Sequence, residues 1–382
     1  MHVRSPHMRW RRRSLSRGFR QRNPLVLVAA LTLLALTLVG LEMLVQAGAI
    51  TAPTEGRFVR YRNDDNGHVN YSMVRLRETP PEGTVVYLLG GSATMECFLS
   101  EESLGASVSR AAGQDVRVIS LAAHEQSFAE SLALVENLPD GTALLAIGLA
   151  PMRFTNSPGD DAGLVYGDPF LLSNPRTRDV LQKEHVTLLP FDSVVPGLFK
   201  YAAGYVQERR RVRLAMFSDI GYSDHYTIDG PLQSRTRKLS MARRDVAQDS
   251  ARYALYADYN FMVLEQLVGL ARARGFGIAF FDQPLNQHVI GPSWDGVVPS
   301  YRRRALALAA RLGVPYLDVA QRVHLEDRDF LDMYHLVVRG RLKWQPVMSR
   351  QVGGVVRDLG TGMASDAPTP TASPSPRTNT SD

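Results

Sequence analysis

The sequence predicts an α/β protein in which helices cover both faces of a parallel sheet, preceded by one membrane-spanning helix. Two observations predict this architecture. Between residues 81 and 360, short apolar segments alternate with amphipathic ones, which is typical of a parallel sheet buried on both faces. Near the N-terminus, residues 24–41 form an uncharged apolar segment of 18 residues.

The membrane segment reads PLVLVAALTLLALTLVGL and continues, after Glu42, to Ala49. A cleaved signal peptide is the alternative, because Ala47-Gly48-Ala49 resembles a cleavage site and RRSL from Arg12 is a weak twin-arginine match. The apolar segment is longer than the ~7–15 residues of a signal core, which favours a retained single-pass anchor over residues 24–49. The basic residues 1–23 should remain cytoplasmic, so the C-terminal body is expected to be extracytoplasmic.

The charge distribution argues against a nucleic-acid partner. The net charge is +6, but the segment before residue 24 carries eight arginines and no acid, which leaves −2 for the remainder (6 − 8). The body is therefore nearly neutral, so the basic net charge is not evidence for nucleic-acid binding, and no nucleic-acid partner is expected. The single cysteine, Cys97, excludes an internal disulfide.

Five segments are expected as strands and five as helices, in alternation. Apolar runs bounded by turn residues predict strands at 84–89, 116–121, 143–149, 277–282 and 315–320. Amphipathic periodicity predicts helices at 100–113, 127–138, 259–275 and 301–313, and a closing helix within 340–360. Ser127 with Glu130 forms a capping-box pattern, and Gly275 is a helix stop signal.

Three segments lack this alternation. Residues 50–80 are polar and are interpreted as a stalk and lead-in to a domain spanning residues 81–360. Within that domain, residues 151–255 are expected to be an irregular insertion, since the periodicity weakens there. Residues 361–382 are rich in Ser, Thr and Pro and are predicted to be a disordered tail.

Three residues could form a nucleophilic site. Ser92 follows the first predicted strand in VVYLLGGSATMECF, and the carboxyl ends of parallel strands are where sites form in open α/β sheets. Asp332 and His335 follow the fifth strand, and a separation of three residues can place both on one face of a turn. A serine, a base and an acid that orients the base are the parts of a catalytic triad, although a turn serine and a helix-capping Asp are the simpler alternatives.

These segments resemble the SGNH hydrolase superfamily. LLGGSATMECF resembles its first block, with Gly in place of the commoner Asp before Ser92, and DMYHLVVRG resembles its Asp-x-x-His block. FFDQPLN at 280–286 is similar to a Pro-x-Asn segment of membrane-anchored members that act in lipoteichoic-acid D-alanylation and alginate acetylation. The resemblance covers about 280 residues, 81–360, and implies a three-layer, flavodoxin-like sheet with Ser92, His335 and Asp332 as catalytic residues.

The oxyanion blocks depart from that family. SLAAHEQS at 120–127 lacks the usual glycine, so the backbone N–H of Glu125, with that of Ser92, is expected to hold the oxyanion. Ala150 stands where the family has a donor asparagine, and removal of one such donor costs about 10²–10³ in rate. Substrate-binding side chains that could replace it are Gln126, Arg153 and Asn286.

The resemblance implies an esterase or O-acyltransferase that acts on acyl esters of a cell-envelope glycan, with a multi-span membrane acyltransferase as a partner. Neither a cofactor nor a metal is expected, because His124 and the other histidines have no partner at ligand spacing. A catalytically silent protein of the same fold, which binds an envelope polymer or scaffolds such a complex, is the alternative that Ala150 motivates. A purely structural surface protein is a third reading.

Overall fold

A computed structural model describes residues 24–46, 69, 72–73, 75–76, 79–167, 175–186, 232–294 and 296–365. The predicted basic segment 1–23, most of the predicted stalk and residues 366–382 of the predicted tail lie outside the described residues. Part of the expected insertion, 187–231, also lies outside them.

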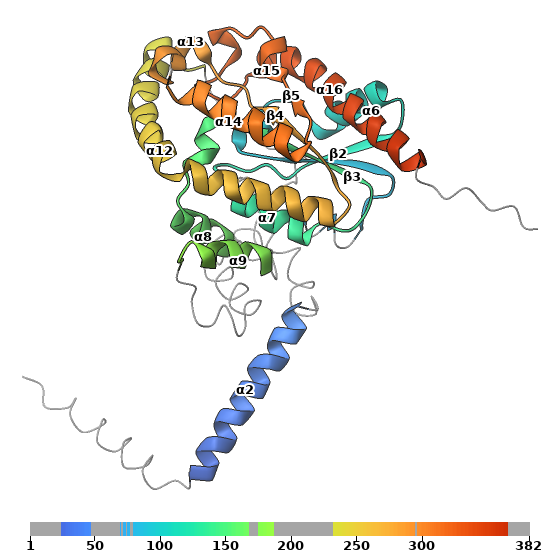
Figure 1. Cartoon of the computed structure of the whole chain (residues 1–382), viewed down its shortest axis with the longest axis vertical. Coiled ribbons are helices and arrows are strands. Elements are labelled where there is room, and N and C mark those ends of the chain that lie inside the picture. The colour runs from blue at the N-terminus through green and yellow to red at the C-terminus, as the bar shows by residue number, and fades with distance from the viewer. Residues whose placement is uncertain are drawn as a thin grey trace, which may run out of the picture.

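Helix α2, Pro24–Gln46, projects away from the folded body (Figure 1). At 1.5 Å per residue its 23 residues extend about 35 Å, slightly more than a bilayer core. Its apolar side chains are exposed, Leu25 at 71% and Leu33 at 67%, and the Thr37 hydroxyl donates to the Leu33 carbonyl within the helix. Among the described helices, α2 is the one that is long and apolar enough to cross a membrane.

The five strands within the described residues are all parallel and form one sheet in the order β2-β1-β3-β4-β5. This sheet confirms the predicted α/β class, and four of the strands lie within about a residue of their predicted bounds. The fifth strand is shorter than predicted, with two paired residues. The strands are β1 Thr84–Leu89, β2 Val116–Ser120, β3 Ala143–Leu149, β4 Gly277–Asp282 and β5 Tyr316–Leu317.

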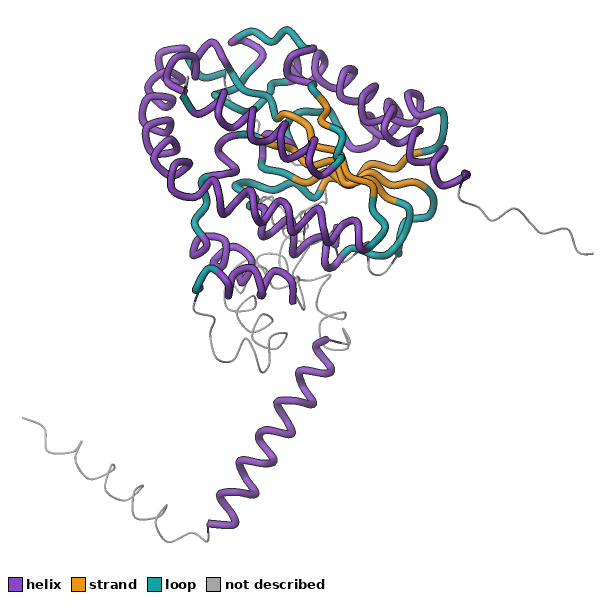
Figure 2. The backbone as a smooth tube through the Cα atoms, in the orientation of Figure 1, coloured by secondary structure: helices purple, strands orange, loops and turns teal. Residues whose placement is uncertain are grey.

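Helices cover both faces of the sheet, so the domain has three layers (Figures 1 and 2). In β1, alternate residues point to opposite faces: Tyr87 and Leu89 join the core under α7, α12 and α14, whereas Val86 and Leu88 join the core under α6 and α16. The covering helices are α6 Glu101–Ala112, α7 Phe128–Asn137, α12 Arg235–Ala273, α14 Val297–Leu312 and α16 Val338–Ser365.

Shorter helices connect these layers. They are α5 Ser92–Met95, η2 Pro151–Phe154, α8 Pro158–Gly167, α9 Pro175–Lys183, α13 Gln287–Ile290, η3 Gly291–Trp294, α15 Val319–Arg322 and η4 Asp327–Asp329.

The local start and stop signals act as the sequence predicts. The Ser127 hydroxyl accepts from the Glu130 N–H at 3.0 Å, and the Glu130 carboxylate accepts from the Ser127 N–H at 2.8 Å, which completes a capping box. Gly275, just after α12, has φ of 76°, a left-handed conformation that glycine adopts without steric cost.

Besides the shorter β5, the structure differs from the sequence analysis in three places. Helix α16 continues to Ser365, five residues into the segment 361–382 that was predicted to be a disordered tail. Val69, Met73 and Leu76, assigned to the stalk, are buried in the core under α7 and α12. The expected irregular segment 151–255 contains η2, α8, α9 and the first 21 residues of α12. The apolar period is weak in that part of α12 because it packs on a small cluster that includes Ala242, Val246 and Trp294 rather than on the sheet.

Candidate active site

The candidate active site lies at the carboxyl edge of the sheet, where four strands end. Ser92 follows β1, the turn 121–126 follows β2, Ala150 follows β3 and Gln283 follows β4. After β1 the chain adds the next strand, β2, toward one edge of the sheet, and after β3 it adds β4 toward the other edge. Such a reversal in strand order opens a crevice at the carboxyl edge, between β1 and β3.

Ser92 is the first residue of the short helix α5. Gly91 precedes it in an extended conformation and accepts the Thr94 N–H at 2.8 Å. The first N–H groups of a helix have no partner within the helix, so the backbone N–H of Ser92 is available to a ligand.

Ser92, His335 and Asp332 lie in hydrogen-bond contact. Ser92 Oγ is 2.8 Å from His335 Nε2, and His335 Nδ1 is 2.7 Å from Asp332 Oδ2. A carboxylate at Nδ1 selects the tautomer with a proton on Nδ1, which leaves Nε2 free to accept the serine proton. The arrangement can therefore activate Ser92 as a nucleophile.

The Asp332 carboxylate is held in its ionised form. Burial disfavours the charge, but the hydrogen bond and charge of His335 and the N–H groups of Tyr334 and His335 outweigh it and lower the pKa of Asp332. Asp332 Oδ1 accepts these N–H groups at 2.8 and 3.0 Å. The N–H groups of the turn thus hold Oδ1 of the carboxylate, and this orients Oδ2 toward the imidazole of His335.

A buried lysine holds the segment before this turn. Lys238, from the first half of α12, donates from Nζ to the Asp327 carboxylate at 3.0 Å and to the Phe330 carbonyl at 2.9 Å. Asn286 donates from Nδ2 to the same carboxylate at 2.8 Å and to the Asp332 carbonyl at 3.1 Å. Asn286, expected to bind substrate, therefore uses its amide N–H groups to position the Asp332 turn.

Arg341, near the start of α16, joins the serine segment to the histidine segment. Its guanidinium forms a buried ion pair with Glu96, which caps α5. Arg341 Nε also donates to the Glu96 carbonyl at 3.1 Å and to the Leu336 carbonyl, next to His335, at 3.0 Å. The sequence analysis missed Glu96, Arg341 and Lys238, because their spacing along the chain has no recognisable pattern.

The turn after β2 lies against the serine turn. Ala123 N–H donates to the Gly90 carbonyl at 3.1 Å, and Gln126 N–H closes the turn on the Ala123 carbonyl at 3.2 Å. Glu125 lies within the turn at φ of 53°, the left-handed region that glycine favours. Glu125 thus adopts a glycine-like backbone conformation in the turn where the resemblance led us to expect a glycine.

Gln126 and Arg153 line the cavity, but their polar atoms have structural partners. The Gln126 amide donates to the Leu121 carbonyl and accepts the Gly90 N–H and the Ser131 hydroxyl. Arg153 donates to the carbonyls of Gln126, Ser127 and Gly148 and to the Ser131 hydroxyl, and it stacks on the Phe128 ring. Burial lowers the pKa of Arg153 to about 9.

Ala150 is buried at the end of β3 and presents no polar side chain to the cavity. Gln283, which the sequence analysis did not consider, lies on the neighbouring strand end and lines the same cavity. Its backbone N–H donates to the Leu149 carbonyl at 2.9 Å, so it lies beside Ala150.

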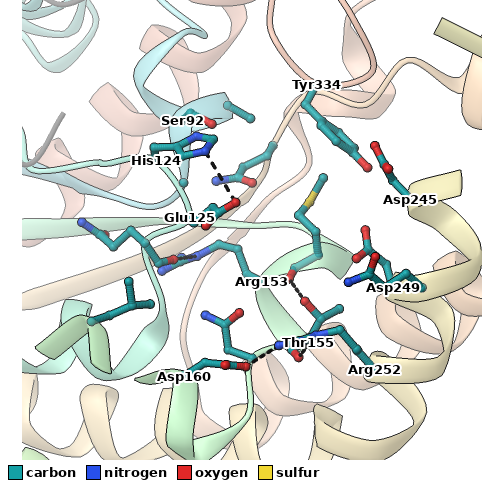
Figure 3. A pocket seen from close by; sticks show the side chains of 18 of the residues that line it. Ser92, His124, Glu125, Arg153, Thr155, Asp160, Asp245, Asp249, Arg252 and Tyr334 are labelled. Atoms are coloured by element: carbon teal, nitrogen blue, oxygen red, sulfur yellow. Dashed lines mark hydrogen bonds and ion pairs between the residues drawn. The ribbon is translucent and has the colours of Figure 1, made fainter. Parts of the chain in front are cut away.

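A cavity of about 790 Å³ opens from the triad. Figure 3 shows Ser92 and His124 at one end, with Asp245, Asp249 and Arg252 of α12 on the facing wall. Burial and the neighbouring Asp245 raise the pKa of Asp249 to about 6, an effect that Arg252 opposes. This wall belongs to the segment that was expected to be irregular.

At the end of the cavity away from Ser92, α12 makes a polar contact with the segment after β3. Arg252 forms an ion pair with Asp160 and donates from Nε to the Thr155 carbonyl at 3.0 Å. Among the residues that the structure describes, no group of three or more His, Cys, Asp or Glu side chains could hold a metal ion.

A scan against protein-family models finds no match to this chain. A search of the curated proteins also finds no relative.

Proposed function

We propose that the protein is a serine esterase or O-acyltransferase of the SGNH type, anchored to the membrane by α2. The observation that carries this proposal is the contact of Ser92 Oγ with His335 Nε2 at 2.8 Å, continued to Asp332 at 2.7 Å. Both distances are within hydrogen-bond reach, the geometry that an activated serine requires. The resemblance of the serine and Asp-x-x-His blocks to SGNH hydrolases supports the same reading.

In the proposed reaction, His335 Nε2 takes the Ser92 proton as Oγ attacks an ester carbonyl. Asp332 holds the Nδ1 proton and stabilises the imidazolium that forms. The backbone N–H groups of Ser92 and Glu125 donate to the oxyanion. The acyl group then passes from Ser92 to water in an esterase, or to a sugar hydroxyl in an acyltransferase.

We further propose that the substrate is an acyl ester of a cell-envelope glycan. The basic segment before α2 favours a cytoplasmic N-terminus, which would place the domain on the envelope side. A cavity of about 790 Å³ is in the range of small-ligand sites, so an acylated sugar unit would fit. A multi-span membrane acyltransferase is the partner that the resemblance to membrane-anchored members suggests.

The second candidate function is that of a catalytically silent SGNH-like protein that binds an envelope polymer or scaffolds such a complex. The observation that favours it is Ala150, because the expected side-chain donor to the oxyanion is absent at that position. This candidate predicts that Ser92 is inert although it contacts His335.

Labelling with a fluorophosphonate separates the two candidates. We expect the full-length protein in detergent to take up one adduct per chain, on Ser92, and Ser92→Ala to abolish labelling. Ser107→Ala is the matched control, because the Ser107 hydroxyl donates to the Ser103 carbonyl within α6, away from the cavity. An unlabelled but folded wild-type protein would favour the silent protein.

A further inference from the structure

Gln283 lies where β3 and β4, two inner strands of the sheet, end side by side. It directly follows β4, and its backbone N–H donates to the Leu149 carbonyl, the last residue of β3, at 2.9 Å. Only 2% of Gln283 is exposed, and it lines the cavity that contains Ser92 and His335. A buried polar side chain at this edge needs a partner for each of its N–H groups.

One N–H of the Gln283 amide has such a partner. Nε2 donates to Thr94 Oγ1 at 2.6 Å, and Thr94 belongs to the same short helix as Ser92. The second N–H of Nε2 has no acceptor among the described residues. This contact fixes the amide plane against α5 and leaves one donor for a group in the cavity.

Two glycines make this approach possible. A Cβ at Gly90 would lie 2.9 Å from Gln283 Nε2, and a Cβ at Gly148 would lie 3.1 Å from Gln283 Cγ; both would overlap the Thr94 hydroxyl. A Cβ at Gly91, next to Ser92, would lie 3.8 Å from Gln283 Nε2. The amide nitrogen therefore lies against the backbone that presents the nucleophile.

The other side-chain donors considered for this role are engaged elsewhere. Gln126 donates to the Leu121 carbonyl and accepts the Gly90 N–H and the Ser131 hydroxyl, so three contacts hold its amide in place. Arg153 donates to backbone carbonyls and to the Ser131 hydroxyl, and Asn286 donates to Asp327 and Asp332. Ala150 has no donor. Gln283 thus combines a position beside Ser92 with an amide N–H that the protein does not use.

We infer that Gln283 is a catalytic residue that donates its free N–H to the oxyanion of the proposed acyl-transfer reaction, in place of the side-chain donor absent at Ala150. This inference rests on the proposed function. As the Ser92 Oγ–carbon bond forms, the carbonyl π electrons move to the carbonyl oxygen and the serine proton moves to His335 Nε2. When the intermediate collapses, the carbonyl re-forms, the bond to the leaving alcohol breaks, and that alcohol takes the proton from His335. Gln283 stabilises the negative oxygen and is not consumed.

The test measures acylation of the full-length protein in detergent, from the burst of p-nitrophenol released by p-nitrophenyl acetate and from the rate of fluorophosphonate labelling. Gln283→Met keeps the length of the side chain and removes the donor, and Gln283→Ala removes both. We expect both variants to lower the acylation rate constant about 10²–10³-fold, with the apparent binding constant for the ester nearly unchanged. Gln182→Ala, on the exposed surface of α9 and outside the cavity lining, is the matched control and should acylate like the wild type.

A structural role would give a different result. If Gln283 only packs, Gln283→Met should retain the wild-type acylation rate, and that outcome overturns the inference while wild-type labelling of Ser92 leaves the proposed function intact. If the wild type itself is neither labelled nor acylated, the proposed function fails and the inference fails with it. Thermal unfolding of each variant identifies any that is misfolded. If Gln283→Ala is misfolded, the acylation rate of Gln283→Met, which conserves the side-chain volume, decides between the two roles.

Discussion

The nucleophile half of the site, with Ser92, His335 and Asp332, is built differently from the oxyanion half, with the turn 121–126, Ala150 and Gln283. In the first half, the proposed nucleophile, base and orienting acid are all side chains, and further side chains hold them in place. In the second half, the donor groups are brought together because adjacent parallel strands end at the same edge. The buried side chains of Gln126 and Arg153 hold the turn there through its backbone groups.

Because the two halves are built differently, each depends on a different feature of the rest of the molecule. The nucleophile half depends on buried polar contacts between distant segments, Arg341 with Glu96 and Lys238 with Asp327. The oxyanion half depends on strand register and on glycines that permit close approach, such as Gly148 beside Thr94 and Gln283. Substitutions should therefore affect activity and stability differently in the two halves.

The largest expected effect on activity is at Asp332. Asp332→Asn should lower the acylation rate constant about 10⁴-fold, because an amide no longer fixes the proton on His335 Nδ1. The variant should still fold, since the side chain can keep its contacts with the turn N–H groups. Burst kinetics with p-nitrophenyl acetate measure the loss, and an Asp332→Asn protein with wild-type acylation would remove Asp332 from the mechanism.

The same substitution has a consequence for stability at acid pH. The pKa of Asp332 is lowered in the folded protein, so its ionised form stabilises the fold above the ordinary value of 3.8. This stabilisation is lost as the pH falls through the folded-state pKa. Between about pH 5 and pH 3, the free energy of unfolding of wild type should therefore decrease more than that of Asp332→Asn. Urea unfolding of the two proteins at several pH values measures this difference. An equal decrease of the free energy of unfolding with pH in both proteins would contradict it.

Arg341→Met should have the largest effect on stability. It leaves the Glu96 carboxylate buried without its cation and removes the link to the Leu336 carbonyl, and breaking a buried ion pair in this way costs about 3–5 kcal/mol. Denaturant unfolding of the full-length protein measures the change.

The control for this loss is Arg311→Met. Arg311 pairs with Glu265 on the surface, where its side chain is 58% exposed and the ion pair is screened by solvent, so removing it should change the free energy of unfolding little. Equal losses from both substitutions would mean that the contact of Arg341 with the serine segment has no special importance.

The smallest effect is expected at Glu125, in the oxyanion half. Glu125→Gly and Glu125→Ala both keep the backbone N–H, so both should acylate within about twofold of wild type if that N–H is the donor. Gly should be the more stable of the two by up to about 1 kcal/mol, because φ is 53° at this position. A large loss of acylation in both variants would contradict a role that is limited to the backbone N–H.

Local signals in the sequence predicted much of the nucleophile half and little of the oxyanion half. The strand before Ser92, the capping box at Ser127 and the spacing of Asp332 and His335 are short-range patterns. The roles expected for Gln126, Arg153 and Asn286 came from residue type alone, and the structure gives their N–H groups structural acceptors. Gln283 was missed because nothing in its neighbourhood along the chain distinguishes it from an ordinary turn residue.

The sequence by itself determined the apolar α2 segment, the alternation of strands and helices, and the pairing of a turn serine with an Asp-x-x-His turn. These features follow from hydrophobic periodicity and from contacts between residues close in the chain. Only the tertiary structure decided that α12 forms a cavity wall, that Arg341 links the serine segment to the histidine segment, and that the Gln283 amide lies beside Ser92. Those contacts join residues 97 to 245 positions apart or arise where strands end side by side, so they exist only once the sheet has formed.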